Sequence, residues 1–499
     1  MTIYINNHSF HYEMENLVRL FFPNDKITVT KELTDKKQTP YIITSMLKNV
    51  TTTAVKAEVV TENFSETNEK IIEPSSESFE KTAERTMAVC LYEILCHLTD
   101  RKQPWGILTG VRPIKLFRRL CAEYGENGAK DYFVNKLLVS EEKTNLSAIT
   151  EKNEKKILSL SKPRSFSLYV SIPFCPTRCS YCSFVSQSIE KAKKLIEPYF
   201  ELLCRELEYT AKLAEECNLN LESVYVGGGT PTTLNAEQLK ILAKTINDNF
   251  NMKTCREFTV EAGRPDTVSR EKLQALLDGG VDRISINPQT LNDSVLEVIG
   301  RRHTAQQTVD AFKLAREVGF RHINMDLIAG LPTDTVESFN GTLDRICGLD
   351  PESVTVHTLA MKRSSRLGEQ GAELTTGNEL PVAKMLRQCE KQLTSAGYHP
   401  YYLYRQSRME GNFENVGWSK DGYDGIYNVY VMDETHTILG CGAGAVSKLK
   451  KPQSEELTRI FNYKYPYEYI NGFEEMLNRK KQVKIFYDEL SEYLSQICV

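Results

Sequence analysis

Short apolar runs alternate with amphipathic segments through the middle of the chain. The runs predict strands, and apolar positions repeating at helical spacing between them predict helices. The predicted strands are 168–172, 222–226, 256–261, 282–287, 321–328 and 353–358. The predicted helices between them are 189–217, 235–249, 269–278, 304–318 and 335–347. Because strands that alternate with helices favour a parallel sheet with right-handed crossovers, we expect an α/β fold built as a partial barrel of six βα units.

Both ends of the chain depart from this alternation. Residues 41–46 and 53–60 predict two strands that pair, the polar segment 61–77 predicts a loop, and 78–100 predicts a helix. Two further helices are predicted within 126–160, another at 380–396, and more over about the last fifty residues. The resulting domains are an N-terminal α+β domain at 1–160, the partial barrel at 161–365 and a smaller C-terminal domain at 366–499.

Composition narrows the class of protein. The chain has 499 residues, of which 41% are hydrophobic and 26% charged, and a net charge of −4. These values are typical of a globular protein and provide no basic field that would attract nucleic acid. No apolar run approaches the roughly 18 residues of a membrane span, and the first ten residues lack the pattern of a signal peptide. The thirteen cysteines form an odd count, unlike a secreted disulfide framework, so we expect a reducing, cytoplasmic location.

Three of those cysteines follow the first predicted strand as Cys-x3-Cys-x2-Cys, at Cys175, Cys179 and Cys182. Thiolates at this spacing suit an iron–sulfur cluster or zinc, but a structural zinc site needs four ligands and no partner pair lies nearby in sequence. Three thiolates would bind three irons of a [4Fe–4S] cluster and leave the fourth open to a ligand. The alternative is three unrelated core cysteines.

Other candidate residues lie at the ends of the later strands, where barrels of parallel strands carry their chemistry. Gly227, Gly228 and Gly229 follow the second strand, and a glycine run lets the backbone approach a ligand and expose its amides. A simple tight turn is the alternative. Glu261 and Asp326 end the third and fifth strands, where a carboxylate can accept hydrogen bonds from a ligand or stand as an ordinary surface charge.

The stretch YVSIPFCPTRCSYCSF at 169–184 resembles the radical S-adenosylmethionine (SAM) enzymes. Tyr169, the run IPFC and Tyr181 are similar to the oxygen-independent coproporphyrinogen III oxidase group, which includes oxidases, heme chaperones and a HemZ-type branch. The resemblance covers about residues 165–450, and WGILTGVRP at 105–113 is similar to the HemZ-type branch. It implies a radical SAM barrel with a [4Fe–4S] cluster and SAM as cofactors.

The resemblance also implies a set of site residues and an activity. Cys175, Cys179 and Cys182 would hold the cluster and act catalytically through it. The implied SAM contacts are Tyr169, Tyr181, Gly228, Gly229, Thr230, Glu261, Gln289, Arg301, Asp326, Ala360 and Val446. The implied reaction is the oxidative decarboxylation of coproporphyrinogen III to protoporphyrinogen IX in porphyrin and heme biosynthesis. The expected partners are a tetrapyrrole substrate, an electron donor and an electron acceptor, without nucleic acid, and the expected state is a monomer.

Several positions depart from the family pattern. Oxidases of the group carry a fourth cysteine where this chain has Phe184, and Asn287-Pro288 replaces Gly-Val before Gln289. The heme-chaperone segment has a His where this chain has Tyr427, and its Trp is missing. Three functions therefore stay open: a coproporphyrinogen oxidase, a heme-binding delivery protein, or a radical SAM enzyme acting on another tetrapyrrole.

The propionates of such a substrate need cationic partners, since a carboxylate that leaves water is costly unless it is paired. Our candidates are Arg112, Arg118 and Arg405. The basic cluster that contains Arg112 and Arg118 has an ordinary solvated helix face as its alternative.

Overall fold

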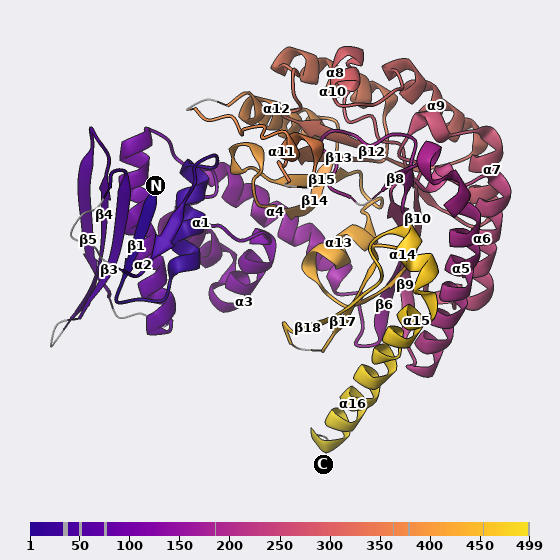
Figure 1. Ribbon diagram of the computed structural model, residues 1–499, viewed down its shortest axis with the longest axis horizontal. Coiled ribbons are helices and arrows are strands. Elements are labelled where there is room, and N and C mark those ends of the chain that lie inside the picture. The colour runs from indigo at the N-terminus through magenta and orange to yellow at the C-terminus, as the bar shows by residue number, and fades with distance from the viewer. Residues whose placement is uncertain are drawn as a thin grey trace. The chain divides into compact units, whose positions relative to one another are not determined.

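The computed structural model describes residues 1–32, 38–48, 52–73, 77–184, 186–362, 364–377, 380–452 and 454–497, with side chains to 491 (Figure 1). The chain divides into two compact units. Unit 1 comprises Met1–Glu151, Gly371–Lys384 and Leu403–Glu414, and unit 2 comprises Lys152–Gln370, Met385–Tyr402 and Asn415–Val499. The three domains expected from the sequence remain a prediction. In the two-unit division, the later segments Gly371–Lys384 and Leu403–Glu414 belong to the same unit as the N-terminal residues.

Unit 1 contains a five-stranded sheet in the order β2-β1-β3-β4-β5. The predicted pair of strands is confirmed as β3 (Tyr41–Lys48) and β4 (Thr53–Val60), which are antiparallel. The prediction of a loop at 61–77 was wrong, because β5 (Ser65–Ile71) pairs with β4 along its whole length. Its side chains alternate between exposed and half-buried, so its sequence is polar like a loop although its backbone is part of the sheet. The remaining strands are β1 (Thr2–Asn6) and β2 (Thr28–Thr30).

The helices of unit 1 supply its core. Helix α2 (Phe79–Thr99) confirms the predicted helix at 78–100, and the side chain of Ser78 caps it by accepting a hydrogen bond from the Lys81 amide. With α1 (His11–Phe21), it covers the sheet through buried apolar side chains. Two helices were predicted within 126–160, but α3 (Pro113–Asp131) begins earlier and only α4 (Glu141–Leu158) lies wholly in that range. The π-helical turn η1 (Tyr132–Lys136) follows α3.

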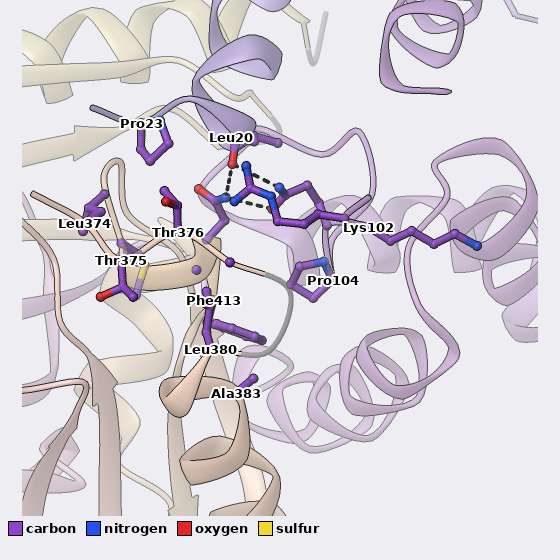
Figure 2. A pocket seen from close by; sticks show the side chains of 16 residues that line it. Leu20, Pro23, Lys102, Pro104, Leu374, Thr375, Thr376, Leu380, Ala383 and Phe413 are labelled. Carbon is purple, nitrogen blue, oxygen red and sulfur yellow. Dashed lines mark hydrogen bonds between the residues drawn. The ribbon is translucent and has the colours of Figure 1, made fainter. Parts of the chain in front are cut away.

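Buried polar contacts explain why the later segments belong to unit 1. Glu414 accepts a hydrogen bond of 2.7 Å from the indole of Trp105 and pairs with the buried Lys143 at 2.7 Å. Asn412 donates to the carbonyl of Leu20 and to Gln103. A cavity of about 80 Å³ remains beside these contacts, and the labelled side chains of Leu20, Thr376 and Phe413 lie around it (Figure 2). It has space for a few water molecules, so we assign it no ligand.

Unit 2 confirms the predicted α/β fold. Its central strands lie in the order in which they occur in the chain, and every neighbouring pair is parallel. They are β6 (Ser165–Ile172), β9 (Asn220–Gly228), β10 (Glu257–Glu261), β11 (Arg283–Ser285), β12 (His322–Ala329) and β13 (Ser353–Thr358). The connecting helices lie in an arc outside the strands (Figure 1). They are α5 (Ile189–Glu216), α6 (Ala236–Asn249), α7 (Arg270–Asp278), α8 (Asp293–Val298), α9 (Ala305–Val318) and α10 (Val336–Leu349).

The C-terminal part extends this sheet at both edges. Strand β16 (Thr437–Cys441) pairs in parallel with β6, and β17 (Val446–Lys450) and β18 (Leu457–Phe461) follow as antiparallel neighbours. At the other edge, β15 (Asn415–Ser419) is antiparallel to β13, and β14 (His399–Tyr404) lies next to it. The helices are α11 (Arg366–Glu369), α12 (Pro381–Ser395), α13 (Ile426–Asp433), α14 (Pro466–Asn471), α15 (Phe473–Lys480) and α16 (Gln482–Ile497). Within the described residues, none of the helices combines the length and the apolar character that crossing a bilayer would require.

Candidate functional site

Five of the six central strands of unit 2 carry one half-exposed polar side chain near the carboxyl end. These residues are Tyr169 on β6, Tyr225 on β9, Glu261 on β10, Asp326 on β12 and His357 on β13. The residues on either side of each within its strand are buried, with β10 ending at Glu261. Because the carboxyl ends of parallel strands meet at one end of a barrel, these side chains form one polar layer there.

Glu261 is hydrogen-bonded within this layer to its neighbour on β9. The hydroxyl of Tyr225 donates to Oε1 of Glu261 at 2.5 Å. Burial raises the pKa of Glu261 to about 7; the negative charge of Asp326 adds to the rise and the hydrogen bond from Tyr225 opposes it. The carboxyl of Glu261 can therefore change its charge near neutral pH.

Asp326 is held differently, and it stays ionised. Although burial opposes ionisation, the nearby His357 and a hydrogen bond from Asn324 hold the pKa of Asp326 below its ordinary value. Asn324 donates to Oδ1 of Asp326 at 2.7 Å, and Nε2 of His357 lies 3.8 Å from Oδ2. The layer thus places a fixed negative charge at Asp326 near a carboxyl that titrates, Glu261.

Three tyrosine rings stack on one another, and one of them, Tyr225, contacts Glu261. The ring of Tyr427, from α13, lies 4.5 Å from that of Tyr225 and 6.2 Å from that of Tyr169, nearly parallel to both. The amide groups of Ile426 and Tyr427 donate to the carboxylate of Glu257, so the first turn of α13 is fixed to the start of β10. The residue at the heme-chaperone His position therefore packs as an aromatic side chain inside unit 2.

The cysteine loop joins β6 to α5 and is braced at several points. The short strands β7 (Phe174–Cys175) and β8 (Gln187–Ser188) pair with each other across the loop. The amide of Ser180 donates to the carbonyl of Ile299 at 3.0 Å, and Thr177 donates to the carbonyl of Gly300 at 3.0 Å. The loop is therefore fixed to the segment that follows α8.

The thiols of this loop lie close enough to influence one another. Burial, together with the neighbouring thiolates of Cys179 and Cys175, raises the pKa of Cys182 to about 11. Burial also raises the pKa of Cys175, with Cys179 contributing. Among the described residues, no three His, Cys, Asp or Glu side chains converge as ligands of one metal ion. An iron–sulfur cluster distributes its thiolates over different irons and supplies the positive charge that stabilises them, so the three cysteines fit a cluster better than a single ion.

Two buried arginines lie beside the cysteines. Arg264 donates to both carboxylate oxygens of Asp266 at 3.0 Å and lies 3.9 Å from the sulfur of Cys179. Arg301 donates to the carbonyl of Asn287 at 2.6 Å; although burial opposes it, the neighbouring Tyr181 and Cys179 raise its pKa. The sequence pointed to Arg301 but not to Arg264, whose only signal was its place in the loop after β10.

The glycine run differs from the expectation that its amides face a ligand. The amide of Gly229 donates to the carbonyl of Ile172 at 2.8 Å, and that of Thr230 donates to the carbonyl of Phe174 at 2.7 Å. A Cβ atom on Gly229 would lie 2.5 Å from the Phe174 oxygen. The run therefore fixes the start of the cysteine loop, and the Thr230 hydroxyl donates to the sulfur of Cys175 at 3.5 Å. Gly228, at φ +103°, lines a groove together with Tyr169.

The remaining expected contacts fall into three places. The backbone of Gln289, at φ +65°, donates to the carbonyl of Asp326 at 2.9 Å, so Gln289 lies at the polar layer. Tyr181 lies in the cysteine loop beside Arg301. Val446 lines the same groove as Tyr169, and Ala360 follows β13 as a half-buried residue. The sequence did not identify Tyr225 and His357, although each is the half-exposed residue near the end of its strand.

The substrate-binding arginines have different surroundings. The guanidinium of Arg405 is buried and donates to the carbonyls of Leu108 and Asn412. Both terminal nitrogens of Arg405 thus donate inside unit 1, and its propionate-binding role remains a prediction. Arg118 is half-buried, with Nε 3.8 Å from Glu151, and Arg112 is the N-cap residue of α3. A propionate-binding role for Arg112 and Arg118 remains a prediction.

Comparison with known proteins now identifies the family. The pattern of the radical SAM superfamily matches residues 169–346. The oxygen-independent coproporphyrinogen-III oxidase-like protein HemZ of Bacillus subtilis is 34% identical over 501 residues, which cover 99% of this chain and 97% of HemZ. The chain belongs to this radical SAM family. A [4Fe–4S] cluster and SAM are therefore its cofactors, as the cysteine motif indicated.

Other radical SAM proteins resemble a smaller part of the chain. The heme chaperone HemW of Bacillus subtilis is 33% identical over 52% of this chain and 69% of HemW. The solved structure of the coproporphyrinogen III oxidase HemN from Escherichia coli is 24% identical, covers 64% of this chain and 72% of HemN, and superposes with a TM-score of 0.49. By name, the sequence relatives of this chain include heme chaperones and oxygen-independent coproporphyrinogen III oxidases.

Proposed function

We propose that this radical SAM protein decarboxylates coproporphyrinogen III oxidatively to protoporphyrinogen IX. The proposal is carried by the polar layer at the carboxyl ends of the central strands. One of its residues lies on β6, the strand before the cysteine loop, and the others lie on later strands. The residues are Tyr169, Tyr225, Glu261, Asp326 and His357. A protein that only carries heme has little need for so many polar groups directed at one small-molecule site.

Different residues would hold the cluster and SAM. Cys175, Cys179 and Cys182 would hold the cluster, and Arg264 and Arg301 would balance the thiolate charge. Glu261 and Asp326 would accept hydrogen bonds from the amine and hydroxyl groups of SAM. When bound, the cluster and SAM together supply a route to abstraction of a hydrogen atom from an unactivated carbon, while the protein provides position and excludes water.

The atoms and electrons of the proposed reaction balance at each propionate side chain. Removal of one hydrogen atom from the carbon next to the ring, loss of CO₂ from the carboxylate and loss of one electron leave a vinyl group. Two such events convert coproporphyrinogen III to protoporphyrinogen IX. The electron must pass to an acceptor, which we propose is a separate molecule.

A heme-delivery role is the second candidate. It is favoured by Phe184, which stands where oxidases carry a fourth cysteine and whose side chain is exposed. It is opposed by Tyr427, because a ring stacked 4.5 Å from Tyr225 is not directed at solvent where heme would be exchanged. A radical SAM enzyme acting on another tetrapyrrole would use the same cofactor residues.

The deciding experiment supplies coproporphyrinogen III, labelled at the propionate carboxyls, with SAM and a reductant under anaerobic conditions. We expect labelled CO₂ to be released in proportion to the 5′-deoxyadenosine formed. Deoxyadenosine without CO₂, together with stoichiometric binding of heme, would overturn the oxidase proposal and favour the carrier.

A further inference from the structure

A groove of about 460 Å³ adjoins the polar layer in unit 2. It is lined by Phe184 of the cysteine loop and by Val446, Phe461 and Lys464 near the C-terminal strands. Tyr169 and Gly228 lie on its inner side. We call it the Phe184–Phe461 groove. It therefore extends from the expected cofactor site toward solvent.

The groove combines exposed apolar surface with positive charge. The side chains of Phe184 and Phe461 are 61% and 58% exposed, although phenyl groups of this size are usually buried. Lys464 is also exposed, and none of the groove's described lining residues is an Asp or Glu. Apolar surface of this kind marks a binding site, and the uncompensated lysine selects a ligand with a carboxylate.

The walls of the groove are fixed by backbone contacts. Val446 and Phe461 face each other across the antiparallel pair of β17 and β18. The amide of Gly444 donates to the carbonyl of Tyr463 at 2.8 Å, and the hydroxyl of Ser171 donates to the carbonyl of Ala443 at 2.8 Å. Binding therefore requires little ordering of the C-terminal wall, which favours affinity.

We propose that the Phe184–Phe461 groove binds the tetrapyrrole, with the macrocycle against the two phenyl rings and one propionate paired with Lys464. The proposal rests on the proposed function and adds the residues that bind its substrate. Because Tyr169 and Gly228 belong both to the groove and to the expected SAM contacts, a macrocycle in the groove would hold a second propionate side chain close to SAM. Phe184 would then serve substrate binding at the position where related oxidases carry cysteine.

The test measures binding separately from turnover. Coproporphyrin III, the coloured oxidised form of the macrocycle, is titrated into the reconstituted full-length protein without reductant, and its absorbance reports the Kd. Phe461→Ala should weaken binding about 5-fold, as expected for loss of one aromatic contact. Lys464→Glu should weaken binding by a similar factor at low salt, and the effect should shrink at high salt because the charges are screened. An uncharged ester of the same porphyrin should not distinguish Lys464→Glu from the wild type.

Matched controls use equally exposed side chains outside the groove. Phe79→Ala removes a phenyl group that is 52% exposed in unit 1, and Lys313→Glu reverses an exposed charge on α9. Both should bind coproporphyrin III as the wild type does, and far-ultraviolet circular dichroism should show that all four variants are folded. A Kd unchanged in Phe461→Ala and in Lys464→Glu would overturn the groove proposal.

The same proteins are then assayed for CO₂ release. If the wild type releases CO₂ while the groove variants bind normally, the groove assignment fails and the proposed reaction stands. If the wild type releases none but binding depends on Phe461 and Lys464, the groove stands and the proposed reaction fails. The two proposals can therefore be refuted independently.

Discussion

Tyr225 donates a hydrogen bond of 2.5 Å to Glu261, between the ends of two adjacent parallel strands. The ring of Tyr225 also stacks with those of Tyr427, 4.5 Å away, and Tyr169, 6.4 Å away. Because burial raises the pKa of Glu261 to about 7 and the hydrogen bond from Tyr225 opposes that rise, the tyrosine sets the pH at which the carboxylate forms. The polar layer therefore gains a negative charge at Glu261 as the pH rises through about 7.

We predict that SAM binding strengthens as the pH rises through about 7. The raised pKa means that Glu261 is neutral below this pH and ionised above it, and only the ionised carboxylate accepts hydrogen bonds with both oxygens. Tyr225→Phe removes the contact that lowers the pKa, so the midpoint should move to higher pH. Glu261→Gln should abolish this transition. The Kd for SAM, measured by calorimetry from pH 6 to about 8.5, checks all three; an unshifted midpoint in Tyr225→Phe would contradict the assignment.

The second prediction concerns the cluster ligands. Changing Cys175, Cys179 or Cys182 to Ala should remove the cluster from each variant, because each thiolate is expected to bind a different iron. Cys204→Ala and Cys255→Ala serve as controls, since these cysteines lie in α5 and just before β10. Iron content and visible absorbance after anaerobic reconstitution give the readout, with about four irons per wild-type chain expected. A full complement of iron in any of the three loop variants would refute its role as a ligand.

The sequence predicted the parts of this site that have a local signature. Three cysteines within eight residues and a glycine run after an apolar strand are visible without any tertiary information. Tyr225 and His357 were missed because a strand of a parallel barrel is apolar on both sides, so alternation does not reveal which side faces the interior. Their positions became evident only from tertiary contacts, since Tyr225 donates to Glu261 and Nε2 of His357 lies 3.8 Å from Asp326.

Long-range pairing explains the errors in the fold. Strand β5 (Ser65–Ile71) is polar and was taken for a loop, because the contacts that make it a strand come from β4 rather than from its own residues. The partner of the Gly229 amide was also not expected from the sequence. Gly229 donates to Ile172, more than fifty residues earlier in the chain, and nothing in the local sequence indicates that partner.

A third prediction follows from that partner. Gly229→Ala should impair cluster assembly, because its Cβ would lie 2.5 Å from the Phe174 carbonyl oxygen and displace the backbone next to Cys175. Overpacking of this kind costs roughly 1–3 kcal/mol of unfolding free energy. Gly341→Ala is the control, since Gly341 is exposed on α10 with open space at its Cβ and should be neutral or slightly stabilising. Denaturant unfolding and iron content are measured on both variants. Equal stability and equal iron content in Gly229→Ala and Gly341→Ala would disprove the bracing role of Gly229.

The last prediction concerns the support of the groove wall. Lys480 forms a fully buried ion pair of 3.0 Å with Glu206, and the other oxygen of Glu206 accepts from the amide of Gly442 at 2.7 Å. This network joins α15 and α5 to the turn after β16, which continues into the groove. Lys480→Met should destabilise the protein by about 3–5 kcal/mol, because it leaves the Glu206 carboxylate buried without its cationic partner.

The double variant Glu206→Gln/Lys480→Met tests this explanation. Removing both charges should restore much of the lost stability, whereas additive losses would show that packing rather than charge is responsible. Lys244→Met is the control, since its pair with Asp248 is exposed on α6 and should contribute no more than roughly 0.5 kcal/mol. Denaturant unfolding of the wild type, Glu206→Gln, Lys480→Met and the double variant gives the coupling energy. Because Gly442 precedes the groove residues Ala443 and Gly444, Lys480→Met should also weaken coproporphyrin III binding, and the double variant should recover it in parallel with stability.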